Sequence, residues 1–143
     1  MNRELTVEIV TQSGVQYRGT VDGLVVPGTL GYLGIRPGHA PLVTGLTIGV
    51  ITLRQPTHDL HAAITGGVME VLDNHVTILA DTAEMAEDID IKRARSAMQR
   101  AQDRLIANSK RTSATYIDVD RARAALLRAV NRLQVVQKAD LSS

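Results

Sequence analysis

Apolar and polar residues alternate along the first half of the chain with the two-residue period of a β-strand. Residues 5–10 and 76–79 follow this alternation, and residues 47–54 are rich in the same β-branched side chains. Many short strands without intervening helices predict a β-sandwich or flattened barrel. The turn-forming residues between the strands are Gly14, Gly23, Pro27-Gly28, Pro37-Gly38, Gly66-Gly67 and Asp73-Asn74, the last pair being typical of a tight hairpin.

The period changes to that of a helix after residue 87. Asp88 is predicted to cap a first helix that starts at Ile89. Residues 108–114 are polar, and Thr115 with Asp118 then resembles a capping signal for a second helix that ends near Gln137. A short connection between two helices predicts an antiparallel hairpin. The apolar face of the first helix consists of Ala94, Ala97, Met98, Ala101 and Leu105.

Together these patterns predict an α+β protein with two parts, a β-sandwich over residues 1–86 and a helical hairpin over residues 87–143. Composition changes at the same place, because all eleven glycines and all four prolines lie at or before Gly67. Residues 1–85 carry four basic and eight acidic side chains, whereas residues 86–143 carry twelve basic and seven acidic ones. We therefore expect two modules with different partners, in which the hairpin adds mainly surface contacts to the sandwich.

The two predicted helices are also a repeat. At an offset of 28 residues, ten of the seventeen residues in 89–105 are identical to their equivalents in 117–133. At about 100° per residue, each copy places three arginines within about 20° of one another around the helix axis. These arginine stripes are Arg93, Arg100 and Arg104 in the first copy and Arg121, Arg128 and Arg132 in the second. The alanine-rich face lies about a quarter-turn away, so close packing of the helices would bring the stripes together.

The arginine stripes leave three interpretations open. They can be a solvated basic face that acidic neighbours neutralise, a site for an anion such as a nucleotide phosphate, or a surface that docks on an acidic protein. Guanidinium groups suit the last two, because they bind phosphate and carboxylate in bidentate fashion. Nucleic acid is disfavoured as a partner by the formal net charge of +1 and by the absence of Phe and Trp.

Catalytic chemistry has little support in the sequence. Cysteine is absent, and the chain has no phosphate-binding loop, no Gly-x-Ser-x-Gly and no His-Glu-x-x-His. His58 and His61 are three residues apart without a carboxylate motif, so a surface role is favoured over metal binding. The N-terminus lacks the apolar run of a signal peptide, and glycines and prolines interrupt the longest uncharged stretch, residues 37–53. We expect a non-catalytic protein with no metal site and no membrane span.

Three blocks of this sequence carry a family resemblance: residues 31–42, residues 64–71, and residues 76–80 running into residues 86–90. In their order and spacing they resemble the epsilon subunit of bacterial and chloroplast F-type ATP synthases. The resemblance extends over almost the whole chain. It implies a sandwich that docks on the gamma subunit and the membrane c-ring, and a hairpin that inhibits ATP hydrolysis.

The resemblance also implies a regulatory ATP site, since Ile89-Asp90-x-x-Arg93-Ala94 matches the signature of family members that sense nucleotide. ATP is thus expected as a regulatory ligand, with no catalytic cofactor and with its dependence on Mg²⁺ undetermined. Matched residue by residue, the site comprises Glu84, Ile89, Asp90, Arg93, Ala94, Arg100, Arg128 and Arg132. The arginines of this set belong to the arginine stripes, although Arg104 and Arg121 lie outside it.

A partner-binding turn is implied as well. The family usually has Gly-Glu-Leu-Gly where this chain has residues 31–34, so Tyr32 replaces an acid and removes a charged contact with the c-ring, although its ring can still pack there. His39 is either a locally bonded turn residue or part of the gamma contact, and the second is favoured. The expected partner-binding residues are Gly31, Tyr32, Leu33, Gly34 and His39.

The resulting hypothesis is a non-catalytic rotor subunit of the central stalk. Its partners would be the gamma subunit, the c-ring and the alpha and beta catalytic subunits. It would be peripheral to the membrane, on the cytoplasmic face of the cell membrane or the stromal face of a thylakoid. The alternative is a stand-alone nucleotide-responsive binding module without synthase partners.

Overall fold

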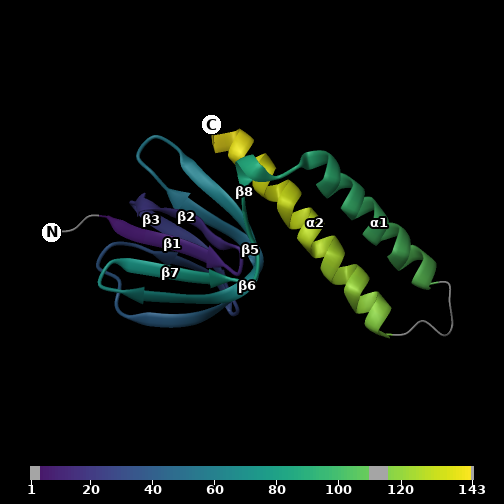
Figure 1. The fold of residues 1–143 in the computed structure, drawn as a ribbon, viewed down its shortest axis with the longest axis horizontal. Helices are drawn as coiled ribbons and strands as arrows, with labels where there is room; N and C mark the ends of the chain where they lie inside the picture. The colour runs from purple at the N-terminus through teal and green to yellow at the C-terminus, as the bar shows by residue number, and fades with distance from the viewer. Residues whose placement is uncertain (1–3, 110–115, 143) are drawn as a thin grey trace.

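The computed structural model describes residues 4–109 and 116–142, in which a β-sandwich precedes two α-helices (Figure 1). The predicted α+β class is confirmed. A short 3-10 helix, η1 (Ala86–Asp88), connects the last strand to helix α1 (Ile91–Ser109), which helix α2 (Tyr116–Ser142) follows. The strands are β1 (Leu5–Thr11), β2 (Gly14–Val21), β3 (Gly23–Gly28), β4 (Gly31–Ile35), β5 (Leu42–Arg54), β6 (Asp59–Leu72), β7 (His75–Ala80) and β8 (Ala83–Met85).

Hydrogen bonds join the strands in the order β2-β1-β7-β6-β5-β3-β4. All the pairings are antiparallel except that of β1 with β7. Strand β8 lies off this path and pairs with residues 62–64 of β6, whereas β7 pairs with residues 67–72 of the same strand. The long strand β6 therefore pairs with β8 along one stretch and with β7 along the next. Strand β8 brings the chain to the edge of the sandwich where the helices begin (Figure 1).

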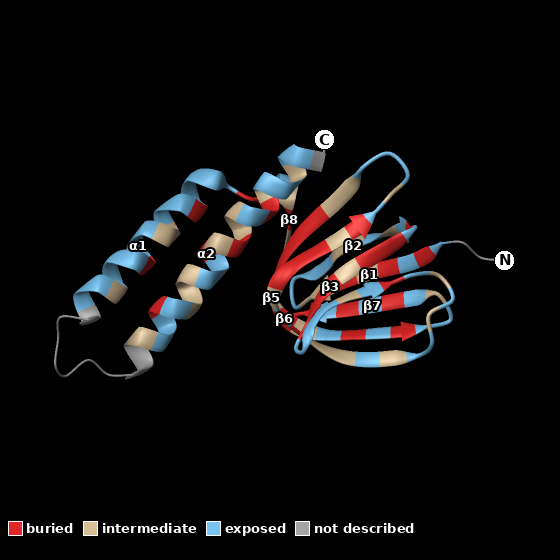
Figure 2. Ribbon diagram, turned by 180° about the vertical axis from the view of Figure 1, so that it is seen from behind, coloured by how far each residue is buried: buried red, intermediate tan, exposed pale blue. Residues whose placement is uncertain are grey.

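The alternation of apolar and polar residues places one face of each strand in the core. On β1, Leu5, Val7 and Ile9 are fully buried, while the residues between them are exposed or half-buried (Figure 2). Since the chain has neither Phe nor Trp, branched aliphatic side chains fill this interior by close packing. Its largest fully buried side chains include Leu24, Ile35, Ile51, Leu53, Ile64, Met69 and Ile78.

Two of the predicted turns have different outcomes. Asp73 and Asn74 have φ of 49° and 61° and connect β6 to β7 by a two-residue hairpin, as predicted. Gly66 and Gly67 are not a turn but lie inside β6, with φ of +132° and +144°. A Cβ on Gly67 would lie 2.1 Å from the carbonyl oxygen of Leu79. Gly67 therefore allows the close approach of β7 at the point where β6 changes partner.

Helix α1 begins later than expected because Asp90, rather than Asp88, caps it. The Asp90 Oδ1 accepts a hydrogen bond from the backbone N–H of Arg93 at 3.1 Å, which is the geometry of an N-cap. Asp88 lies in η1 instead. Helix α2 continues to Ser142, beyond the expected end, and the predicted cap at Thr115 lies outside the described residues. Neither of the described helices has the combination of length and apolar character that crossing a membrane requires.

Small residues form the seam between α1 and α2. Ala94 and Ala101 on α1 and Ala122 and Ala129 on α2 are buried, and each α2 alanine follows its α1 equivalent by the 28 residues of the repeat. The repeat therefore encodes the same packing face twice, and the antiparallel hairpin brings the two faces together. Ala97, Met98 and Leu105, the other members of the predicted apolar face, are half-buried.

The hairpin packs on the sandwich through more than surface contacts, contrary to the expectation. Val50 of β5 and Ala63 of β6 join Ile89, Ala94 and Val135 in a second cluster of buried side chains. Because these five residues come from the sandwich, from the connection and from both helices, burial itself ties the base of the hairpin to the sheet.

Residues 1–86 are expected to fold without the hairpin, because the main core draws all its side chains from this segment. The fragment should nevertheless melt below the full chain, since removing the helices exposes Val50 and Ala63. A loss of about 1 kcal/mol would lower the melting temperature by about 4–8 °C in a domain of this size. Thermal melts followed by far-UV circular dichroism, with the full chain as control, measure this. A disordered spectrum from the fragment would contradict the prediction.

Candidate functional site

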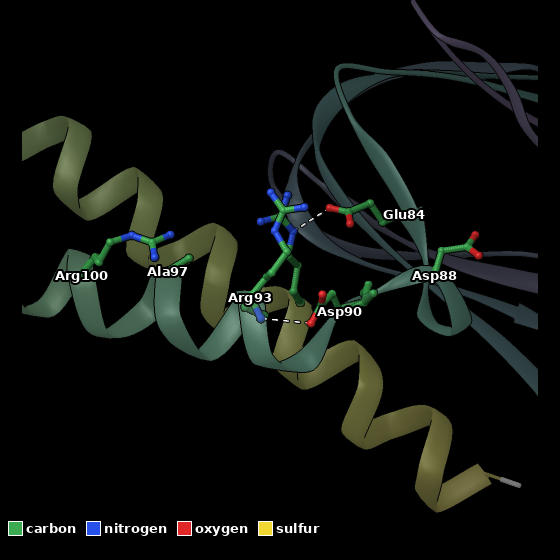
Figure 3. Close-up of a pocket in the computed structure, with 9 residues that line it drawn as sticks. Glu84, Asp88, Asp90, Arg93, Ala97 and Arg100 are labelled. Atoms are coloured by element: carbon green, nitrogen blue, oxygen red, sulfur yellow. Dashed lines mark hydrogen bonds and ion pairs between the residues drawn. The ribbon is translucent and has the colours of Figure 1, made fainter.

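A pocket of about 260 Å³ lies where the edge of the sandwich meets both helices (Figure 3). Strand β8 contributes Glu84 and α2 contributes Arg132, while η1, the connection after it and α1 supply the rest. The pocket therefore exists only when α2 is packed beside α1 and against the sandwich. Its lining residues are Glu84, Asp88, Ile89, Asp90, Arg93, Ala94, Ala97, Arg100 and Arg132.

Backbone hydrogen bonds hold the wall of the pocket in place. Glu84 lies on β8, in register with Ala63 of β6. Further along, the N–H of Ile89 donates to the carbonyl of Ala86 at 3.3 Å, and the side chain of Ile89 is buried. Asp90 then starts α1 as its cap. The chain between β8 and α1 is thus positioned by local hydrogen bonds and by one buried apolar side chain.

Arginines reach the pocket from both helices. The Nε of Arg132 donates to Glu84 Oε1 at 2.6 Å, so two further nitrogens of this guanidinium are left for other partners. Arg93 and Arg100 follow each other along α1 (Figure 3), and neither takes part in an ion pair within the described residues. A pocket lined by three arginines favours an anion, because charge-assisted hydrogen bonds to phosphate or carboxylate are among the strongest available.

The structure brings most of the expected ATP-site residues together. Arg128 is the exception: it is exposed on α2, one turn before Arg132, and does not line the pocket. Asp88 and Ala97 line the pocket although they were not expected to, and helical spacing from Arg93 could have identified Ala97. The expected residues that do line it are Glu84, Ile89, Asp90, Arg93, Ala94, Arg100 and Arg132. Their role in binding ATP stays a prediction.

The turn between β3 and β4 presents most of the residues expected to bind partners. Gly31, Tyr32, Leu33 and Gly34 all lie on β4, and Tyr32 is 58% exposed. At the tip of the turn Leu30 is fully exposed. Leu30 was not among the expected partner-binding residues, although an apolar residue between two turn-forming segments is a usable signal. With Tyr32 beside it, the turn has an apolar tip.

His39 is bonded within its own turn. Its backbone N–H donates to the carbonyl of Arg36 at 3.1 Å, and its Nδ1 lies 2.7 Å from the carbonyl oxygen of Ala40. His39 is thus a locally bonded turn residue in this structure. The favoured alternative, a contact with the gamma subunit, stays a prediction.

A second groove, of about 570 Å³, lies between the sandwich and the C-terminal end of α2. It contains His61, which was expected at the surface but is only 6% exposed and has its Nδ1 3.3 Å from Thr52 Oγ1. Burial lowers the pKa of His61, a nearby Asp59 acts in the opposite direction, and Lys138 lowers the pKa further. His58 is exposed, as expected. In the part of the chain that the structure describes, no three His, Asp or Glu side chains are grouped to hold a metal ion.

Family models match both parts of the chain. The model described as ATP synthase, Delta/Epsilon chain, beta-sandwich domain matches residues 4–86. The model described as ATP synthase, Delta/Epsilon chain, long alpha-helix domain matches residues 87–137. The two together extend over nearly the whole sequence.

Bacterial proteins named ATP synthase epsilon chain are similar in sequence. The one from Pelotomaculum thermopropionicum is 48% identical over 99 residues, which are 69% of this chain and 74% of that protein. The one from Desulforamulus reducens is 44% identical over 110 residues, which are 77% of this chain and 82% of that protein. The one from Halalkalibacterium halodurans is 49% identical over 102 residues, or 71% and 76% of the two proteins.

Two solved structures share the fold. A chain in the structure of the Euglena gracilis mitochondrial ATP synthase, comprising OSCP, F1 and the c-ring, has a TM-score of 0.78 at 18% identity over 96% of this chain and 83% of that one. A chain in the central stalk and c-ring structure of the Tetrahymena thermophila enzyme has a TM-score of 0.56 at 17% identity, over 92% and 96%. With both family models and the bacterial relatives in agreement, the chain belongs to the ATP synthase delta/epsilon family, as an epsilon-type, non-catalytic subunit of the F-type enzyme.

Proposed function

We propose that this chain is a central-stalk rotor subunit that restrains ATP hydrolysis through its hairpin, and that ATP bound in the hairpin pocket relieves this restraint. The observation that carries the proposal is that Arg93 and Arg100 from α1 meet Arg132 from α2 at one pocket. A ligand that bridges the two helices binds the closed hairpin in preference to an open one, and it stabilises the closed form by this difference in affinity. Calorimetric titration of the full chain with ATP tests the proposal, and an absence of binding would remove its regulatory part.

The polar groups of the pocket suit different parts of a nucleotide. Phosphate oxygens accept hydrogen bonds, so Arg93, Arg100 and the terminal nitrogens of Arg132 are appropriate partners for them. Carboxylates also accept, so Glu84 and Asp88 suit the adenine amino group or the ribose hydroxyls. The pocket volume of about 260 Å³ is slightly below the range of about 300–1,000 Å³ typical of ligand sites. Part of the bound nucleotide would therefore extend into solvent.

The inhibitory form requires the hairpin to open. Residues 108–114 contain neither Gly nor Pro, so the side chains there permit a helix that continues from α1 into α2. Most of this segment lies outside the described residues. A continuous helix over residues 88–136 would be about 73 Å long. It would extend along the gamma shaft and bring the second arginine stripe to acidic segments of the alpha and beta catalytic subunits.

We propose that the sandwich, and in particular the turn between β3 and β4, docks on the gamma subunit and the c-ring. The support for this is the apolar tip formed by Leu30 and Tyr32, together with membership of the family. A subunit held in this way is peripheral to the membrane. Since the relatives compared above are bacterial, we place it at the cytoplasmic face of the cell membrane.

Leu30→Glu is expected to weaken assembly with a reconstituted gamma–c-ring complex by about tenfold to a hundredfold. Burying a leucine side chain contributes about 1.5–3 kcal/mol, and about 1.4 kcal/mol corresponds to a factor of ten. The affinity of each variant and of the parent chain is measured by binding to the gamma–c-ring complex immobilised on a surface. Thr57→Glu, which adds the same charge at the exposed turn between β5 and β6, is the control. Equal losses from the two variants would place the contact elsewhere.

A further inference from the structure

Strand β5 lacks a strand partner on one side at the Gly49–Val50 peptide. Its pairing with β3 aligns Thr52 with Val25 and then Leu46 with Gly28, so two residues of β3 stand opposite five residues of β5. One of these two is Pro27, which has no N–H to donate. The peptide groups of β5 that face β3 in this stretch therefore need other hydrogen-bond partners, while β6 pairs with β5 on the opposite side.

Two side chains from distant parts of the fold bond to this one peptide unit. The N–H of Val50 donates to the hydroxyl oxygen of Tyr32 at 3.2 Å. The carbonyl of Gly49, on the other side of the same peptide bond, accepts from the amide nitrogen of Asn131 at 2.8 Å. Tyr32 lies on β4, directly after the exposed turn between β3 and β4, and Asn131 belongs to α2. A single peptide thus connects the partner-facing turn to the hairpin.

The surroundings of this peptide are tight. A Cβ on Gly49 would lie 2.5 Å from Pro27 Cβ and 2.8 Å from the Tyr32 hydroxyl, so only glycine leaves room for both neighbours. Asn131 is 6% exposed, and the same amide nitrogen also lies 3.4 Å from the carbonyl of Ile64 on β6. The amide is therefore a buried polar anchor of α2 that bonds to both long strands.

Asn131 also precedes Arg132 directly in the chain. The anchor holds this turn of α2 at a defined height and rotation against the sandwich, and Arg132 then meets Glu84 at 2.6 Å in the nucleotide pocket. Asn131 touches no residue of the pocket ligand set through these bonds. It is a positioning residue, because it acts on the pocket through the placement of α2.

We propose that Tyr32, the Gly49–Val50 peptide and Asn131 form a hydrogen-bonded joint through which the turn between β3 and β4 controls the docking of the hairpin. Drawing the Tyr32 hydroxyl away leaves the Val50 N–H without its acceptor on the β3 side, while β6 still pairs with this stretch of β5. A tilt of the peptide that follows this loss moves the carbonyl that accepts from Asn131. Hydrogen bonds at the two ends of one peptide also strengthen each other by polarisation. A partner that engages the exposed Tyr32 ring therefore loosens α2 and the Arg132 side of the pocket. This inference rests on the proposed function only in treating hairpin opening as regulatory.

The test is a double-mutant cycle on the full chain without nucleotide, read by amide hydrogen exchange of α2. Tyr32→Phe should speed the exchange of α2 by about threefold to tenfold, the range for one neutral hydrogen bond. Asn131→Ala should speed it by about tenfold to a hundredfold, because it removes the buried hydrogen bonds from Asn131 to the carbonyls of Gly49 and Ile64. In the Asn131→Ala background, Tyr32→Phe should change the logarithm of the exchange rate by less than half of what it does in the parent chain. Core amides of β1 and β7 should be unchanged.

Tyr17→Phe is the matched control, since Tyr17 is a half-buried tyrosine of the same sandwich beside the groove at α2 and its hydroxyl has no hydrogen bond to the described residues. It should leave the exchange of α2 unaltered. Two outcomes would contradict the joint. In one, the factors by which Tyr32→Phe and Asn131→Ala speed exchange simply multiply in the double variant. In the other, α2 exchanges equally in the parent, the two single variants and the double variant. Because the cycle uses the isolated chain, its outcome is independent of whether the hairpin inhibits hydrolysis, which an activity assay of the assembled enzyme decides.

Discussion

Arg93→Ala is expected to weaken ATP binding by about ten- to a hundredfold. Each hydrogen bond to a charged group contributes about 1.5–3 kcal/mol, and about 1.4 kcal/mol changes the dissociation constant tenfold. Arg93 lines the pocket and makes no ion pair within the described residues, so phosphate does not have to displace a carboxylate from it. Isothermal titration calorimetry of the full chain with ATP measures the loss.

Arg95→Ala is the control for this variant. It removes the same charge from an exposed position on the same helix, but its side chain leaves the helix about 160° away from that of Arg93. ATP affinity should change little. An equal loss from Arg93→Ala and Arg95→Ala would show that ATP responds to the general positive charge of α1 and not to the pocket.

Arg128 and Arg132 distinguish the pocket from the site that the family resemblance implies. Arg132→Ala should reduce affinity at least as much as Arg93→Ala, because it also leaves the Glu84 carboxylate without its partner in a pocket that receives an anion. Arg128→Ala should reduce it less, since Arg128 does not line the pocket. A loss from Arg128→Ala equal to that from Arg132→Ala would mean that the hairpin closes further around bound ATP.

Locking the hairpin closed is expected to raise ATP hydrolysis by the assembled enzyme at low ATP, up to the rate reached when ATP keeps the parent hairpin closed. Ala101 and Ala122 are the buried seam alanines nearest the connection in each helix, so the antiparallel packing sets them at similar heights. A disulfide between Ala101→Cys and Ala122→Cys would prevent the helices from separating. Since the parent chain has no cysteine, no other disulfide within this subunit competes.

The measurement compares hydrolysis by the oxidised and reduced forms of the double variant in a reconstituted complex, over a series of ATP concentrations. The difference should be largest at low ATP and should vanish at high ATP, where the ligand already favours the closed form. The two single-cysteine variants are controls for the effect of oxidation itself. If oxidation leaves hydrolysis unchanged at every concentration, the hairpin is not the inhibitory element.

The division of the chain into sandwich and hairpin could be predicted because each part has its own local period. Alternation along residues 5–10 buries Leu5, Val7 and Ile9 on one face of β1, which only requires that successive strand residues point to opposite sides. The repeat likewise predicts the seam, since Ala94 and Ala122 occupy equivalent positions on two similar helices. Regularities of this kind depend on neighbours in the sequence, and the sequence displays them directly.

Local patterns predicted less where two interactions compete for one residue. Asp88 and Asp90 both precede the helical period, and Asp90 became the cap because η1 takes up Asp88. Gly66 and Gly67 have the composition of a turn, yet they lie within β6. The strand continues through them because β8 pairs with residues 62–64 before them and β7 pairs with residues 67–72. In both cases the decision depends on backbone hydrogen bonds to residues that the local pattern does not include.

By itself, the sequence determined the α+β class, the antiparallel hairpin with its alanine seam, and the arginine stripes beside that seam. Most of the residues that line the pocket were implied by the family resemblance. The tertiary structure alone decided that Arg128 does not line the pocket, that His61 is buried, and that Asn131 anchors α2 to β5. The physical reason is the same for all three. Each depends on the height and rotation at which α2 rests on the sandwich. That placement results from contacts between residues 48 to 82 positions apart in the chain, beyond the range of the helical and strand periods.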